Sequence, residues 1–133
     1  MKKLLSTAAV LLLVVVCVCF AESRNSYEIS ITVSPRTLSL GSPGECLTVH
    51  TDIDFNDVVL DSTLMLYVPV TESEIVYNGV KSDLRGNLVA KFDRDAVKDA
   101  VEDQVGREVE LILKGFDVDG NAFEGSDYIR VKK

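Results

Sequence analysis

The 133-residue chain has 21 acidic and 14 basic side chains, and its formal net charge of −7 disfavours binding to nucleic acids or anionic lipids. His50 is the only histidine, so a histidine-rich metal centre is excluded and any Ser-His-Asp arrangement would have to use this residue. The sequence also lacks a GxSxG elbow, a phosphate-binding loop and a dinucleotide-binding fingerprint. We therefore expect a protein without catalytic activity.

Residues 1–21 are predicted to form a signal peptide. Lys2 and Lys3 precede an apolar run over 4–20, and Cys19 and Ala21 are the small residues at −3 and −1 of a cleavage site. The alternative is an uncleaved N-terminal anchor, because the run is only slightly shorter than a membrane span. We expect export to the periplasm or the extracellular space with no membrane insertion after cleavage, or tethering to the envelope by the anchor.

The rest of the chain is predicted to be one domain. Residues 22–28 form an N-terminal lead-in, and residues 29–133 have the length of a single domain that needs no disulfide to hold its core. Cys46 is the only cysteine outside the leader, so no intramolecular disulfide can form in the mature chain. We expect its thiol to be packed or shielded in a strand, and the protein to be monomeric.

Short segments with apolar residues at every second position recur along the chain and are typical of half-buried strands. They span 29–33, 47–49, 64–68, 75–77, 88–92, 109–113 and 128–131. About seven strands at this spacing predict an all-β, antiparallel two-sheet sandwich. The expected inward-facing residues are Ile31, Val33, Leu47, Val49, Leu64, Leu66, Leu88, Ala90, Leu111, Leu113, Ile129 and Val131. Phe92, Phe116 and Phe123 are the expected large fillers, although Phe116 has the outward parity of its strand.

The segments between the strands contain turn and helix signals. Asn78-Gly79 predicts a tight hairpin turn after 75–77, and Asp119-Gly120 predicts another one near the C-terminus. Residues 96, 97, 100 and 101 are apolar at helical spacing, with Asp93 as a capping residue before them. These residues predict one short crossover helix.

An acidic loop after the second predicted strand resembles the start of a calcium-binding loop. Asp52, Asp54 and Asn56 have the spacing of the first three ligands of an EF-hand. The sixth and twelfth positions, however, are Asp57 and Thr63 instead of glycine and glutamate. A solvated loop is the simpler interpretation, and a calcium site of lower coordination that uses Asp52, Asp54, Asn56 and Asp57 is the alternative. No other cofactor is expected.

Several segments resemble Ig-like modules of secreted bacterial and archaeal proteins. In the later half these are the stretch NLVAKFDRDAV at 87–97, residues 109–115, Asp119-Gly120, Phe123-Glu124-Gly125, Asp127 and Ile129-Arg130-Val131. In the earlier half they are Val33-Ser34-Pro35, Thr37-Leu38, Leu40, Gly44 and Thr48-Val49-His50. Between residues 54 and 85 only Asn78-Gly79 matches. The resemblance implies an Ig-like sandwich that acts as a noncatalytic surface or spacer module.

Together these observations predict a secreted, noncatalytic Ig-like module with a binding or structural role at the cell envelope. Its partner would be a protein or a glycan bound through exposed sheet edges or loops. The alternative is a calcium-dependent adhesive module that uses the acidic 52–57 loop.

Overall fold

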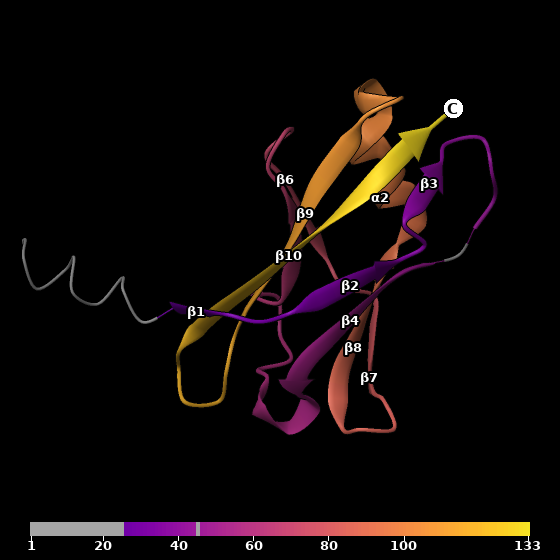
Figure 1. The fold of residues 1–133 in the computed structure, drawn as a ribbon. Helices are drawn as coiled ribbons and strands as arrows, with labels where there is room; N and C mark the ends of the chain where they lie inside the picture. The colour runs from indigo at the N-terminus through magenta and orange to yellow at the C-terminus, as the bar shows by residue number, and fades with distance from the viewer. Residues whose placement is uncertain (1–25, 45) are drawn as a thin grey trace, which may run out of the picture.

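A computed structural model of the chain describes residues 26–44 and 46–133, and the predicted signal peptide lies outside this part (Figure 1). The strands are β1 (Ser26–Glu28), β2 (Ile31–Ser34), β3 (Thr37–Ser39), β4 (Cys46–Asp54), β5 (Met65–Val68), β6 (Ser73–Val76), β7 (Gly79–Ser82), β8 (Asn87–Asp93), β9 (Glu108–Phe116) and β10 (Ala122–Lys132). One α-helix, α2 (Arg94–Val101), and two 3₁₀ turns, η1 (Phe55–Asp57) and η2 (Glu102–Gln104), complete the described part.

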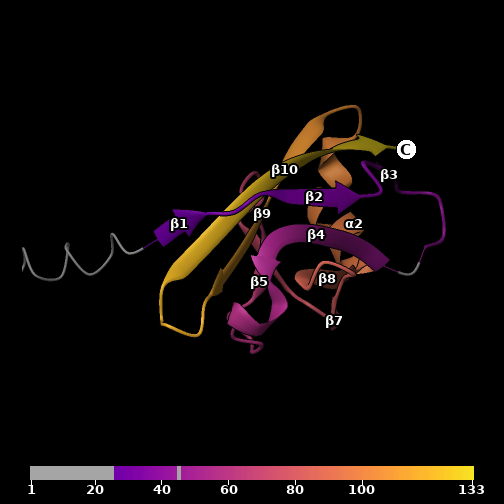
Figure 2. The same ribbon diagram turned by 60° about the horizontal axis from the view of Figure 1, so that its bottom comes forward.

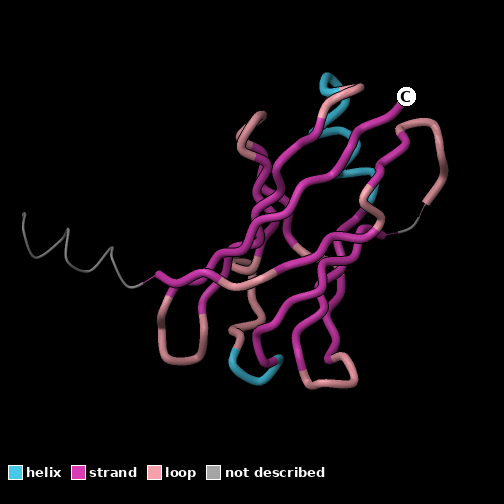
Figure 3. Tube along the Cα trace, in the orientation of Figure 1, coloured by secondary structure: helices cyan, strands magenta, loops and turns pink. Residues whose placement is uncertain are grey.

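The strands form two sheets. The first sheet has the order β1-β10-β9-β5-β6, with β3 also paired to β10, and the second sheet has the order β2-β4-β8-β7. One apolar core lies between the two sheets, and most loops lie at the two ends of the strands (Figure 3). The predicted all-β two-sheet sandwich is therefore confirmed.

Residues 26–39 contribute strands to both sheets, which alternation alone did not predict. β1 and β3 pair in parallel with β10 of the first sheet, whereas β2, between them, pairs antiparallel with β4 of the second sheet. Figure 2 shows β2 lying between β10 and β4. The structure thus has more strands than the expected seven, and not every pair is antiparallel. Residues 26–28, expected to be a lead-in, are part of the first sheet.

The core confirms the predicted strand parity. All twelve residues expected to face inward are buried, and Phe92 and Phe123 join them. Phe116 is 42% exposed, so the expectation that it fills the core is wrong. The parity explains the difference: in β9 the buried positions are 109, 111, 113 and 115, and residue 116 points to the opposite face.

The short crossover helix is also confirmed. α2 connects β8 of the second sheet to β9 of the first sheet, and the Asp93 carboxylate accepts a hydrogen bond from the Asp95 backbone N–H at its start. Val97 and Val101 are buried on the side that faces the core. The helix therefore closes one end of the sandwich.

The hairpin predicted at Asn78-Gly79 is wrong. β6 pairs with β5 in the first sheet and β7 pairs with β8 in the second, so these two residues lie where the chain crosses between the sheets. Neither residue has a positive φ. The second turn is confirmed: Gly120 has a φ of 87° in the loop that joins β9 to β10.

The two ends of the described chain lie at opposite ends of the sandwich (Figure 1). Ser26 pairs with Ala122 at the start of β10, and the chain ends just after Lys132 at the end of the same strand. At ordinary strand geometry the length of β10 is about 33 Å. None of the helices in the described part is long and apolar enough to cross a membrane.

Candidate binding face

The acidic residues of the calcium prediction lie at the end of β4 and in η1. Asp52 and Asp54 are exposed on the same side of β4, and Asn56 and Asp57 are exposed in the 3₁₀ turn. The Asp52 carboxylate accepts a hydrogen bond of 2.9 Å from the Ser30 backbone N–H. The Asp54 carboxylate accepts one of 2.8 Å from the Asn56 backbone N–H. Both carboxylates therefore stabilise local backbone.

In the two described ranges, no three acidic, histidine or cysteine side chains are grouped so that they could hold a metal ion. A calcium site at Asp52, Asp54, Asn56 and Asp57 would need these side chains to move together, and it stays a prediction.

A calcium titration of the melting temperature tests this site. A bound ion raises the melting temperature by mass action, and the Asp54→Asn variant should abolish that rise. The Asp99→Asn variant, on the exposed side of α2, is the control for the lost charge. An unchanged melting temperature at millimolar calcium removes the calcium-dependent alternative.

The outer face of the first sheet exposes several apolar side chains. Phe116, Tyr128 and Val76 are 42%, 53% and 51% exposed. Met65, Tyr67 and Ile112 are half-buried beside them, at outward positions of β5 and β9. We call this surface the binding face; it consists of Ser26, Glu28, Met65, Tyr67, Glu74, Val76, Glu110, Ile112, Lys114, Phe116, Ala122, Glu124, Ser126 and Tyr128.

The pairing register places these outward residues in rows across the sheet. Met65 is the partner of both Val76 and Lys114, and Lys114 is also the partner of Glu124. In the next row towards the β9–β10 turn, Phe116 pairs with Ala122. The face is therefore continuous from β6 to β1, across strands that are far apart in the sequence.

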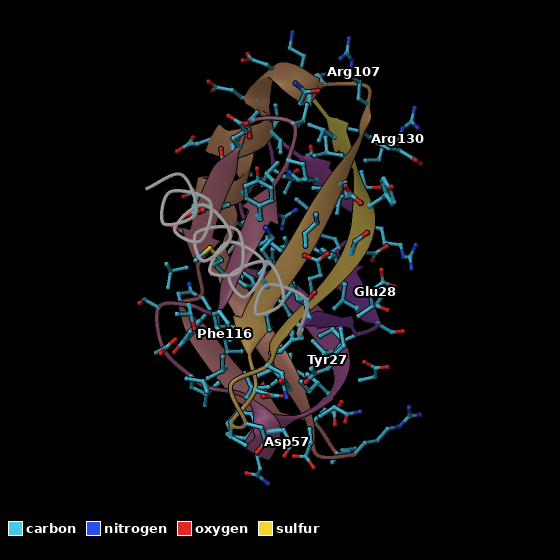
Figure 4. The ribbon with its side chains drawn as sticks, turned by 90° about the vertical axis from the view of Figure 1, so that its left-hand side faces the viewer. Tyr27, Glu28, Asp57, Arg107, Phe116 and Arg130 are labelled. Atoms are coloured by element: carbon cyan, nitrogen blue, oxygen red, sulfur yellow. The ribbon has the colours of Figure 1, made fainter. Side chains whose placement is uncertain are left out.

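Two hollows adjoin on the binding face. The first, of about 540 Å³, has a mainly apolar lining that includes Met65, Phe116 and Ala122. The second, of about 380 Å³, is lined by Glu28, Glu110, Glu124 and Ser126, together with Ile112, Gly125 and residues 29–31. Glu124 lines both hollows. Figure 4 looks onto this face, with Phe116 and Glu28 on either side of β9 and β10.

One lysine lies among the glutamates of the face, because Lys114 is the cross-strand partner of Glu124. The Lys114 ammonium lies 4.3 Å from the centre of the Tyr67 ring, a cation–π contact. The Glu110 carboxylate accepts a hydrogen bond of 3.0 Å from the Ser126 hydroxyl. Among the described residues, the ion pair found within 4 Å is Lys98–Asp95, on α2. Within the described part of the chain, the carboxylates that line the second hollow therefore have no cation within ion-pairing distance.

Hydrogen bonds to the Asp117 carboxylate hold the edge of the binding face at the β9–β10 turn. Its Oδ1 accepts the backbone N–H of Asn121 (2.8 Å) and of Asp119 (3.0 Å), which closes the β9–β10 turn. Its Oδ2 accepts the Tyr27 hydroxyl at 3.0 Å, which links β1 to this turn. This geometry agrees with the turn predicted at Asp119-Gly120.

This network changes the pKa of both partners. The Asn121 backbone N–H is the main cause that lowers the pKa of Asp117 below its usual 3.8, and the Tyr27 hydroxyl adds to it. Partial burial, followed by the hydrogen bond and the charge of Asp117, raises the pKa of Tyr27 to about 12. The ionised aspartate and the neutral tyrosine are thus the stable pair.

We expect the contribution of Asp117 to stability to be complete above about pH 4 and to be lost as the pH falls through its lower folded-state pKa. Stability decreases at low pH because the Asp117 carboxylate binds a proton less readily in the folded state than in the unfolded state. Thermal melting from pH 7 to pH 2 should show a smaller acid-induced loss in Asp117→Asn than in the parent. Parallel curves for the two proteins would contradict the proposed linkage.

The binding face was not among the predicted sites, although the sequence contains a signal for it. Segments 64–68 and 111–113 are apolar at consecutive positions, so apolar residues occur on both sides of β5 and β9. Continuous apolar runs of this kind indicate a strand covered on both faces. Here the outer side of these strands is open within the described chain.

No family model, curated protein or solved structure matches this chain.

Proposed function

We propose that this protein is an exported, noncatalytic Ig-like module that binds a partner or has a structural role at the cell envelope, with the binding face as its contact surface. The exposed Phe116, Tyr128 and Val76 on one face are the observation that supports binding most strongly. Apolar side chains exposed together on one face of a domain are typical of interaction sites. The proposal that the module is noncatalytic rests on the lack of catalytic motifs in the sequence.

The order of the strands supports the Ig-like part of the proposal. An Ig-like sandwich has strands A, B, E and D in one sheet and strands C, F and G in the other, with further strands in variable-type domains. If β2 is strand A and β10 is strand G, the second sheet has the order A-B-E-D, and the first contains G-F-C followed by one more strand. The chain lacks the tryptophan and the disulfide of antibody domains.

The position of the chain ends supports a structural role beside binding. Because Ser26 and Lys132 lie at opposite ends of β10, neighbouring segments would leave the domain in opposite directions. This arrangement suits a module that spaces two parts of an envelope assembly.

Crosslinking in the native cell envelope tests the proposed binding. Tagged mature protein should capture a defined set of partners, and the Phe116→Ser/Tyr128→Ser variant should lose them. The Leu84→Ser variant is the matched control, because Leu84 is fully exposed in the β7–β8 loop, away from this face. If all three proteins return the same material, the binding face is not the contact surface.

Export is tested separately by N-terminal sequencing of the secreted or periplasmic protein. Cleavage of the predicted signal peptide gives a mature start at Glu22. Recovery of chains that begin at Met1 in washed membranes would favour the uncleaved anchor.

A further inference from the structure

We infer that the binding face recognises a protein segment in which a large apolar side chain and a lysine or arginine lie a few residues apart. This inference rests on the proposed function, and it assigns the chemistry of the partner. The two adjoining hollows, one apolar and one acidic, are the observation behind it.

The apolar hollow can accommodate one large side chain of a partner. Its walls include Met65 from β5, Phe116 from β9 and Ala122 from β10. Phe116 is 42% exposed, so a bound side chain would remove apolar surface of the protein as well as its own from water. A large side chain of a partner that enters a concave, apolar hollow in this way is typical of the anchor positions of interfaces.

The acidic hollow fits a basic side chain. Glu28, Glu110 and Glu124 reach it from three different strands, and they are outside ion-pairing distance of the cations in the described chain. An arginine or lysine would make charge-assisted hydrogen bonds with these carboxylates. A second copy of the same face would instead bring four further glutamates and, as its one cation, Lys114, so a basic partner is the better match.

The spacing of the two hollows limits the partner further. Ala122 of the apolar hollow and Glu124, shared by both hollows, are two residues apart on β10 and point to the same face. Two residues of an extended chain span about 7 Å. A partner segment lying along β10 in extended conformation would therefore place its basic residue two or four positions from its apolar anchor.

Titration of the mature protein with a synthetic peptide tests this inference. The probe is acetyl-Ser-Phe-Thr-Lys-Thr-Lys-Ser-amide, and the matched control peptide has glutamate in place of both lysines. Amide chemical shifts should change along β9 and β10 with the lysine peptide, and the binding should weaken as salt is added. Equal binding of the two peptides would overturn the inference.

Variants separate the two hollows. Phe116→Ser and Glu28→Gln/Glu124→Gln should each weaken binding of the lysine peptide by about tenfold or more, as expected for anchor positions. Leu84→Ser and Glu102→Gln/Asp103→Asn are the controls: they make matched changes of polarity and charge at exposed sites outside the face. Equal losses in variants and controls would contradict the assignment.

The outcomes distinguish this inference from the proposed function. If envelope crosslinking depends on Phe116 and Tyr128 but the lysine peptide does not bind, the face is a contact surface and its assigned chemistry is wrong. Sedimentation of the mature protein tests the competing occupant. A dimer that the Phe116→Ser/Tyr128→Ser variant converts to a monomer would assign the face to a second copy of the chain and overturn the inference.

Discussion

Replacement of Leu111 by alanine is expected to lower the free energy of unfolding by about 2–5 kcal/mol, the usual cost of a large-to-small change in a core. Leu111 is completely buried on β9, a central strand of the first sheet. The shortened side chain leaves a cavity that neighbouring core residues fill only in part. Urea unfolding of the parent and the variant measures this loss as a shift of the midpoint, provided that the dependence of the unfolding free energy on urea is the same in both.

The neighbouring residue provides the control for this result. Ile112 is half-buried on the opposite side of the same strand, so Ile112→Ala removes less buried surface and creates no enclosed cavity. Its loss of stability should be clearly smaller than that of Leu111→Ala. Similar losses in both variants would mean that the outer face is as tightly packed as the core.

Replacement of Gly125 by alanine is expected to destabilise the protein by about 1–3 kcal/mol, the usual effect of inserting atoms into a packed site. A Cβ atom at this position would lie 2.7 Å from the Ile29 carbonyl oxygen and 2.7 Å from Ile31 Cγ2. Because the first of these atoms is backbone, no change of rotamer can relieve the contact. The segment between β1 and β2 would have to move away from β10.

Two measurements check the Gly125 result. Unfolding in urea gives the loss of stability, with Gly41→Ala as the control, because a Cβ at Gly41 has no atom within 4 Å. Hydrogen exchange of the Ile29 amide, which donates to the Glu124 carbonyl oxygen at 2.9 Å, reports whether this segment has moved. Unchanged exchange and unchanged stability would show that β10 has more space here than the contacts indicate.

Period-two alternation predicted which side chains are buried, because a strand inside a sandwich must place its apolar side towards the opposite sheet. It did not predict which strands share a sheet. Asn78-Gly79 has the residue types of a hairpin turn, yet β5 and β8 offer separate partners to the strands on either side of it. Tertiary pairing therefore decided the path of the chain at this point.

The binding face could not be predicted for the same reason, because the sequence pattern did not show which strands are neighbours in the sheet. Glu28, Glu110 and Glu124 lie in three strands, and they meet only because β10 lies between β1 and β9. The size of Phe116 predicts a core filler, but its parity in β9 points outward and the structure follows the parity. The acidic residues near Asp54 were recognised from their spacing, and the structure shows that Asp54 caps a short 3₁₀ turn.

The parallel pairing of β1 and β3 with β10 has a mechanical consequence. Ser26 and Lys132 lie at opposite ends of β10, so a pull between the two ends of the domain would act along the axes of these paired strands. The backbone hydrogen bonds between them would then bear the load in shear, all at once, instead of opening one after another. We expect the domain to resist extension strongly in this direction and to yield at lower force when pulled across the sheet.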